Sequence, residues 1–191
     1  MSQDSPFRVA IVGCGNISQA YGNSLNTKPE KVQILGAYDL DSERANAYTE
    51  EFGGQAYSSL EAVLEDDRIE AVINLTIHSA HAEVTAAALK AGKHVHVEKP
   101  LATNRQDGQM VVNLAEEKGL RLSASPFTFL GEGQQTVLKA IQSGQIGQVL
   151  TAYAEMNWAR IERWHSNPVP FYQQGVGPML DVGVYALTFL T

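Results

Sequence analysis

Cysteine and positive charge are both scarce in this sequence. The 191 residues include one cysteine, Cys14, so no internal disulfide can form and a disulfide-stapled secreted scaffold is excluded. We therefore expect a reducing compartment, the cytoplasm. Lys and Arg number 14 against 21 Asp and Glu, which gives a formal net charge of −7. This balance argues against nucleic-acid and anionic-membrane partners, since both require a basic surface.

Long apolar runs are also missing. No stretch approaches the length of a transmembrane helix, and the N-terminal residues MSQDSPFR contain no apolar signal region. We therefore predict neither a signal peptide nor a membrane span. The apolar fraction of 44% is close to the average of globular proteins, so the chain can bury a sizeable core.

Short apolar runs alternate with segments of helical spacing, a pattern typical of a parallel α/β sheet. The runs that predict strands are 7–12, 32–38, 71–75, 94–98 and 121–125. Helices are expected from about Asn16, from about Ser42, after the third and fourth strands, and over 132–142. In the helix after the third strand, the spacing predicts that one face packs on the sheet; this face comprises Ala80, Val84, Ala87, Ala88 and Ala91.

Helix starts are indicated by two capping-box patterns. One pairs Ser58 with Glu61 and the other pairs Thr103 with Gln106. After Gly147 the alternation of short apolar runs and helical segments ends. Residues 149–158 are predicted as a long strand, and 159–175 show no hydrophobic period. A last helix is expected from about Gly177. A domain boundary is therefore expected near residue 125.

A glycine-rich turn, Gly13–Ser18, follows the first predicted strand and opens the first helix. Its pattern is G-x-G-x-x-S, where the dinucleotide fingerprint has Gly or Ala at the last position. Gly13 permits a tight turn and Gly15 lets a pyrophosphate approach the backbone. The N–H groups at Asn16 and Ile17, at the helix N-terminus, can bind phosphate. The alternative is a purely structural turn.

Asp39 ends the second predicted strand, about 20 residues beyond the turn, where a carboxylate accepts hydrogen bonds from the adenosine ribose. Such a carboxylate repels a 2′-phosphate, so we predict NAD as cofactor. Arg44 could pair with that phosphate, which keeps NADP as the alternative. Cys14 is interpreted as a small filler in the turn, although the nearby helix N-terminus could also lower its pKa.

The fourth predicted strand delivers Glu98, Lys99 and Pro100 to the carboxyl edge of the sheet, where ligands bind in open α/β folds. With this motif the sequence resembles the Gfo/Idh/MocA oxidoreductase family. The resemblance is carried by the glycine turn, by AGKHVHVEKP at 91–100 and by GVGPMLDVGVY at 175–185, and it covers essentially the whole chain.

This resemblance implies a Rossmann-type doubly wound parallel sheet, followed by the start of an incomplete α+β second domain. Residues 1–125 would form the dinucleotide-binding domain. Residues 126–191 would begin the substrate and dimerisation domain. It also suggests that the Lys99–Pro100 peptide bond is cis.

In the family, the motif lysine lies near nicotinamide and substrate, and the later motif supplies an Asp with a His or Tyr four residues on. Carried over, these catalytic residues are Lys99, Asp181 and Tyr185. Tyr185 would accept the hydroxyl proton, with its pKa lowered by the Lys99 ammonium, and Asp181 would orient the substrate or Lys99. Taken singly, the three could instead be a solvated lysine, a helix cap and an aromatic at the core edge.

The loop after the third strand holds Thr76, His78 and His81, where the family usually has T-P-N-x-x-H. Thr76 and His81 fit this pattern, and His78 stands where the pattern has Asn. We predict that these residues, with Glu98 and Lys99, contact the cofactor; for His78 a surface histidine is an equal alternative. No metal site is predicted from the five histidines, because convergent Cys or carboxylate support is lacking.

Trp158, Arg160 and Trp164 are weaker candidates for substrate contact, through sugar hydroxyls or an anionic group, with plain packing as the alternative. The function implied is hydride transfer between a nicotinamide cofactor and the hydroxyl carbon of a sugar, polyol or related cyclic alcohol. The alternative is a noncatalytic dinucleotide-binding or regulatory remnant of such an enzyme.

Family members are substantially longer and continue into a large, mainly antiparallel sheet. Only the first strand of that sheet, 149–158, is expected here. We therefore expect a truncated enzyme, a homo-oligomer that forms through the C-terminal part, or a chain whose second half comes from a partner.

Overall fold

The computed structural model describes residues 5–165, 167–173 and 176–191. It divides into two compact units, Met1–Ser123 and Ala124–Thr191. Gly175, part of the third family motif, lies outside the described residues.

The first unit is built on a six-stranded sheet with the order β3-β2-β1-β4-β5-β6. Pairing is parallel between β1 and β2, β1 and β4, β2 and β3, and β4 and β5. The chain order reverses between β1 and β4, which makes this the topological switch point of a doubly wound fold. The prediction of a Rossmann-type sheet is confirmed. The strands are β1 Phe7–Val12, β2 Val32–Tyr38, β3 Gln55–Ala56, β4 Ala71–Asn74, β5 His94–Val97 and β6 Leu122–Ala124.

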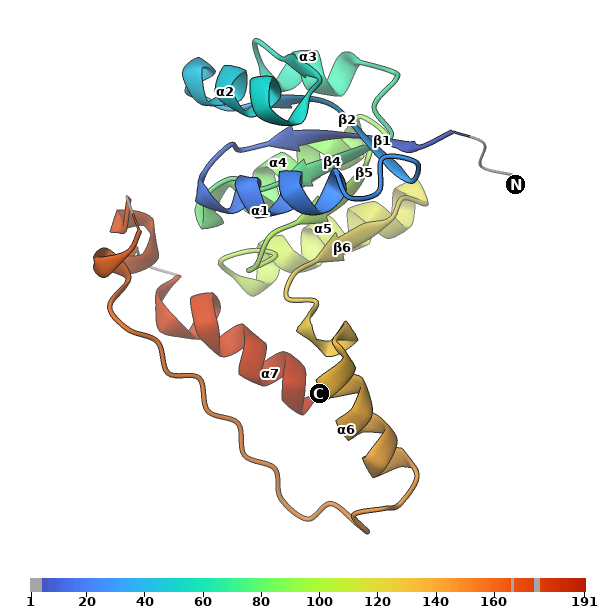
Figure 1. Ribbon diagram of the computed structural model, residues 1–191, viewed down its shortest axis with the longest axis vertical. Coiled ribbons are helices and arrows are strands. Elements are labelled where there is room, and N and C mark those ends of the chain that lie inside the picture. The colour runs from blue at the N-terminus through green and yellow to red at the C-terminus, as the bar shows by residue number, and fades with distance from the viewer. Residues whose placement is uncertain (1–4, 166, 174–175) are drawn as a thin grey trace. The chain divides into compact units, whose positions relative to one another are not determined.

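Helices lie on both sides of this sheet (Figure 1). In the first unit they are α1 Asn16–Leu25, α2 Ser42–Phe52, α3 Leu60–Glu65, α4 His81–Lys90 and α5 Arg105–Lys118. Because the sheet is covered, the β1 residues from Val9 to Val12 are all buried. Helix α1 approaches α2 closely at Gly22, where a Cβ would lie 2.7 Å from the ring of Phe52.

The predicted buried face of α4 is wrong except at Ala88. The side chains that are buried are His81, Ala82, Thr85, Ala86, Ala88 and Leu89. This segment is rich in alanine on all sides, so the apolar period alone does not select a face. The contacts of α4 with the sheet and with α5 select it instead.

Both predicted capping boxes begin one residue too early. Helix α3 is capped by Ser59, whose hydroxyl accepts from the Ala62 N–H at 3.1 Å. Helix α5 is capped by Asn104, whose side chain accepts from the Asp107 N–H at 2.9 Å. In each case two neighbouring residues can cap a helix, and tertiary packing decides between them.

The second unit contains α6 Glu132–Gln142, as predicted, and α7 Val184–Leu190. A wider π turn, Met179–Gly183, precedes α7, so the last predicted helix is present with an irregular start. Short 3-10 turns cover Thr128–Leu130, Ile161–Arg163 and Val169–Tyr172.

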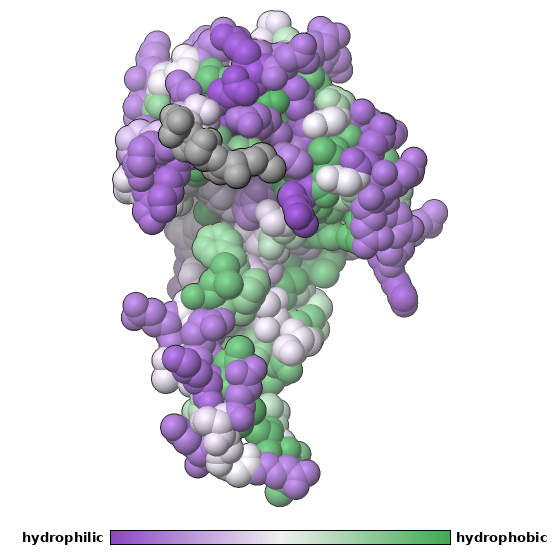
Figure 2. All heavy atoms as spheres, turned by 90° about the vertical axis from the view of Figure 1, so that its right-hand side faces the viewer, coloured by the Kyte–Doolittle hydropathy of each residue, from purple (hydrophilic) through white to green (hydrophobic). Residues whose placement is uncertain are grey.

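The predicted strand 149–158 is wrong, because these residues adopt no regular structure. A strand needs a neighbour to pair its N–H and C=O groups. Within the described part of the second unit, the only strand residue is Ala124, at the end of β6. Hydrophobic side chains, drawn green in the lower part of Figure 2, reach the surface of this unit; Leu150 is 85% exposed and Tyr153 is 80% exposed.

Candidate functional site

The glycine turn after β1 packs directly on the end of β4. Gly13 has φ +97°, and a Cβ at this position would lie 2.6 Å from the Leu75 carbonyl oxygen. Only glycine fits both the conformation and the close approach. At Gly15, by contrast, no described atom lies within 4 Å of a built Cβ, so the backbone borders open space at the N-terminus of α1.

Ser18, which departs from the fingerprint, has a clear structural role. It is 1% exposed, and its hydroxyl donates to the Gly15 carbonyl at 2.7 Å. The buried serine therefore adds a hydrogen bond within the turn, at the position where the fingerprint has Gly or Ala.

Asp39, directly after β2, is hydrogen-bonded to the glycine turn. Its Oδ2 accepts from the Cys14 N–H at 2.7 Å and its Oδ1 accepts from the Asp41 N–H at 2.9 Å. Each carboxylate oxygen has capacity for a further hydrogen bond. The carboxylate is therefore fixed beside the turn and can still accept from ribose hydroxyls.

Cys14 and Arg44 are the other candidate residues near Asp39. Burial, and secondarily the Asp39 charge, raises the pKa of Cys14 to about 12. The alternative of an activated thiol is wrong, and Cys14 is a filler whose Sγ lies 3.8 Å from the Tyr38 carbonyl. Arg44 Nε lies 3.3 Å from Asp41 Oδ2 in an exposed ion pair. Such pairs contribute at most about 1 kcal/mol, so Arg44 stays available to a phosphate.

The segment after β5 reaches the same edge of the sheet. The Glu98 N–H donates to the Asn74 carbonyl at 3.0 Å, and the Lys99 N–H donates to Glu98 Oε2 at 2.8 Å. The Lys99–Pro100 bond is cis, as the family resemblance suggested. Because the carboxyl ends of parallel strands share one edge, Gly13, Asp39 and Lys99 border one region at the switch point.

Asn74, at the end of β4, organises the loop that follows. It is completely buried. Its Oδ1 accepts from the Thr76 hydroxyl at 2.7 Å, and its Nδ2 donates to the His81 carbonyl at 3.0 Å and to Thr85 Oγ1 at 3.2 Å. Sequence reasoning missed Asn74; the signal was a single amide within an otherwise apolar strand.

His81 is 1% exposed. Its Nδ1 lies 2.6 Å from the Pro100 carbonyl and its Nε2 lies 3.0 Å from the Thr76 carbonyl. Burial lowers the pKa of His81, although both carbonyls and Glu98 act in the opposite direction. The ring is buried between the two loops that it joins, and a contact of His81 with the cofactor stays a prediction.

His78 is half-buried in the 3-10 turn His78–Ala80, with its ring centroid 5.9 Å from that of His81. Its contact with a cofactor stays a prediction, as does that of Thr76. Among the residues that the structure describes, no group of three or more His, Cys, Asp or Glu side chains could hold a metal ion.

The candidates of the second unit lie on two of its segments. Asp181 is in the π turn before α7, and Tyr185 is in the first turn of α7 itself; both are half-buried. Trp158 and Trp164 form an edge-to-face pair with centroids 6.2 Å apart, and Arg160 precedes the 3-10 turn between them. A joint site of Lys99 with Asp181 and Tyr185 stays a prediction.

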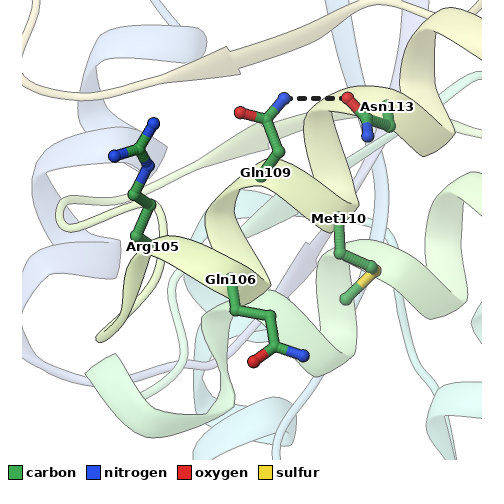
Figure 3. Close-up of a pocket in the computed structure, with 5 residues that line it drawn as sticks. All are labelled: Arg105, Gln106, Gln109, Met110 and Asn113. Atoms are coloured by element: carbon green, nitrogen blue, oxygen red, sulfur yellow. Dashed lines mark hydrogen bonds between the residues drawn. The ribbon is translucent and has the colours of Figure 1, made fainter.

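A separate hollow of about 540 Å³ lies on the surface of α5 (Figure 3). One face of this helix supplies its whole lining, which comprises Arg105, Gln106, Gln109, Met110 and Asn113. Gln109 and Asn113 are joined by a hydrogen bond of 2.8 Å. None of the residues at the carboxyl edge of the sheet lines this hollow, so it is distinct from the candidate cofactor site.

Comparisons with known proteins agree with this geometry. The family model described as the oxidoreductase family, NAD-binding Rossmann fold (Gfo/Idh/MocA), matches residues 7–125. The chain is 31% identical over 185 residues to dTDP-3,4-didehydro-2,6-dideoxy-alpha-D-glucose 3-reductase of Actinomadura kijaniata, covering 96% of this chain and 54% of that protein. It is 29% identical to inositol 2-dehydrogenase of Salmonella typhimurium, covering 87% and 48%. The chain thus spans about half the length of these relatives.

Solved structures show the same similarity. A 3-ketoreductase from Actinomadura kijaniata in complex with NADP matches with a TM-score of 0.68 and 34% identity, over 75% of this chain and 46% of that one. The WlbA dehydrogenase from Bordetella pertussis in complex with NADH and UDP-GlcNAcA matches with a TM-score of 0.71 and 29% identity, over 74% and 43%. The first unit is therefore an NAD-binding Rossmann domain. In the described residues, no helix combines the length and apolarity needed to cross a membrane.

Proposed function

Since the chain belongs to the Gfo/Idh/MocA family of oxidoreductases, we propose that it acts in hydride transfer between a nicotinamide dinucleotide and the hydroxyl carbon of a sugar, polyol or related cyclic alcohol. The observation that carries the proposal is the 2.7 Å hydrogen bond from the Cys14 N–H to Asp39. It holds a ribose-binding carboxylate beside a glycine turn that has open space at Gly15.

The residues at the carboxyl edge fit such a cofactor. The pyrophosphate would bind at Gly15 and the first N–H groups of α1, at Asn16 and Ile17. Asp39 would accept from the adenosine ribose, which favours NAD, with Arg44 as the group that would favour NADP. Thr76, His78 and Glu98 would lie along the nicotinamide half. When bound, the nicotinamide supplies the acceptor or donor of hydride.

The chain would supply the proton chemistry. Tyr185 would take the substrate hydroxyl proton, with its pKa lowered by the Lys99 ammonium. Asp181 would orient the substrate or Lys99, and Trp158, Arg160 and Trp164 would contact the substrate. The relatives named above support the substrate class, because their names describe a sugar-nucleotide reductase and a polyol dehydrogenase.

Turnover of the full chain with sugars, polyols and nucleotide sugars tests this proposal. Lys99→Ala should abolish turnover and leave the affinity for the cofactor within about threefold, because Lys99 acts on the reacting atoms. Lys90→Ala, at the exposed end of α4, is the control and should behave as wild type. Loss of turnover and cofactor affinity together would show that Lys99 serves binding or folding instead.

Saturable cofactor binding without turnover of any substrate would favour the second candidate, a noncatalytic dinucleotide-binding module. The specific observation behind this candidate is that the cofactor residues lie on the packed sheet of the first unit, whereas Asp181 and Tyr185 belong to the second unit.

A further inference from the structure

Three side chains beyond the predicted site residues, Tyr21, His96 and Ser123, form a line of hydrogen bonds that ends at Glu98. The Tyr21 hydroxyl, from α1, donates to Glu98 Oε1 at 2.8 Å and lies 2.9 Å from His96 Nε2, from β5. His96 Nδ1 in turn lies 2.9 Å from the hydroxyl of Ser123, from β6. These contacts join one helix and two strands of the first unit.

The direction of each hydrogen bond follows from the number of protons. A tyrosine hydroxyl carries one proton, and here it is donated to the Glu98 carboxylate, so Tyr21 accepts from Nε2–H of His96. A neutral imidazole protonated at Nε2 has its lone pair at Nδ1, which accepts from the Ser123 hydroxyl. The chain of donors therefore runs from Ser123 through His96 and Tyr21 to Glu98.

Burial agrees with a neutral His96. Removal of the ring from water lowers the pKa of His96, and the Glu98 charge opposes this only in part. The Tyr21 and His96 rings also touch, with centroids 5.7 Å apart. Packing thus fixes the ring that sets the orientation of the Tyr21 hydroxyl.

The two oxygens of Glu98 accept hydrogen bonds from different partners. Oε1 accepts from Tyr21, and Oε2 accepts from the Lys99 N–H at 2.8 Å. Tyr21 lies on the helix that starts at the glycine turn, so Glu98 connects that helix to the main chain of Lys99. In a doubly wound sheet the pyrophosphate lies at the switch point, and Asp39 marks the adenosine side. The Glu98 side therefore faces the nicotinamide half.

We propose that Tyr21 and His96 are positioning residues that hold Glu98 and, through it, the Lys99 main chain against the nicotinamide half of a bound dinucleotide. This role rests on the proposed function. It acts through Glu98 and requires no contact between Tyr21 or His96 and the cofactor.

The test compares two ligands on the full chain. NADH uses both halves of the site, whereas ADP-ribose uses only the adenosine and pyrophosphate half. Tyr21→Phe should raise the Kd for NADH about tenfold, the effect of losing one hydrogen bond to a charged group. The same variant should leave the Kd for ADP-ribose within about twofold.

Tyr57→Phe is the matched control. The Tyr57 hydroxyl also donates to a carboxylate, Asp66 Oδ2, at 2.7 Å, but Asp66 follows α3 and is not at the candidate site. The control should lose stability as Tyr21→Phe does, but it should bind NADH and ADP-ribose with the affinities of wild type. A Tyr21→Phe protein that binds NADH as wild type would overturn the proposal, as would one that loses both ligands equally.

Variants of His96 test the direction of the hydrogen bonds between Ser123, His96, Tyr21 and Glu98. His96→Gln keeps an N–H that can donate to Tyr21 and should retain NADH affinity within about threefold, whereas His96→Leu should weaken it like Tyr21→Phe. Nitrogen-15 NMR of the imidazole should show the Nε2–H tautomer, and the Nδ1–H tautomer would refute the assigned direction. If wild type binds neither ligand, the proposed function itself fails; normal binding by Tyr21→Phe refutes only the positioning role.

Discussion

The two units of the chain bury their apolar residues to very different extents. The first unit covers both faces of its sheet, and Ile11, Val72 and Leu89 are completely buried. Among the described residues of the second unit, only Ile161 and Val176 belong to the buried apolar set. Trp158 and Leu150 of that unit are 66% and 85% exposed.

This difference bears on how each unit can hold functional groups. In the first unit, Asp39, Asn74 and Glu98 are fixed by hydrogen bonds to main chain that a packed sheet supports. Such support preorganises a site. The exposed apolar side chains of the second unit provide less of it, so we expect cofactor binding to depend on the first unit and stability to report mainly on its core.

The largest expected effect separates the two cores. Ile11→Ala should lower the free energy of unfolding by about 3 kcal/mol, because it leaves a cavity in the sheet. Leu150→Ala should change it by less than about 0.5 kcal/mol, because that side chain is already in solvent. Urea denaturation followed by circular dichroism measures both. Equal losses would contradict the contrast between the units.

The next largest effect on stability is expected from substitutions at two glycines, one in each unit. Gly13→Ala must adopt φ near +97° and meet the Leu75 carbonyl, so it should lower stability by about 2 kcal/mol and abolish NADH binding. Gly144, in the second unit, has φ +74° and open space around it. Gly144→Ala should cost about 1 kcal/mol and leave NADH binding intact. Nucleotide titration and thermal unfolding check both, and normal binding by Gly13→Ala would refute the role of the turn.

The pH dependence of stability sharpens the comparison further. Burial lowers the pKa of both His81 and His96 in the folded first unit, so the unfolded chain binds more protons just below its own histidine pKa of about 6.5. The stability gained from neutral histidines is complete above that pH and is lost as the pH falls toward 5. Melting temperatures should drop between pH 7.5 and 5, and the His81→Gln, His96→Gln double variant should reduce that slope. If the melting temperature of the double variant depends on pH as that of wild type does, the two buried histidines are not the cause of the pH dependence.

The smallest expected effect has the opposite sign. The Tyr48 hydroxyl is buried without a hydrogen-bond partner in the described structure, so Tyr48→Phe should raise the free energy of unfolding by up to about 1 kcal/mol. Tyr57→Phe, which removes a satisfied hydroxyl, should lower it by about the same amount. A destabilised Tyr48→Phe protein would show that the hydroxyl has a partner in solution.

Much of the first unit could be predicted because its signals are local. The strands are short apolar runs, and the glycine turn and the end of β2 have characteristic residues at fixed spacing. The family motif at 91–100 is also a local signal, and it allowed Lys99 to be placed at the carboxyl edge of the sheet. Features that depend on contacts between distant segments were not predictable: Tyr21 meets His96 and Glu98 from 75 and 77 residues away.

Two segments show how the surroundings act on a local pattern. The apolar run 149–158 has the composition of a strand, but no described strand pairs with it. His81 fits a cofactor-loop pattern, yet tertiary packing buries it between the Thr76 and Pro100 carbonyls. In both cases the local pattern was read correctly and the surroundings decided the structure.

A fluorescence titration of the full 191-residue chain with NADH and, separately, NADPH tests the central claim most directly. We predict saturable binding of both, with NADH tighter because the Asp39 carboxylate, fixed by the Cys14 N–H, repels a 2′-phosphate. Tighter binding of NADPH would transfer the selectivity to Arg44. A chain that is folded by circular dichroism and binds neither nucleotide would contradict the account.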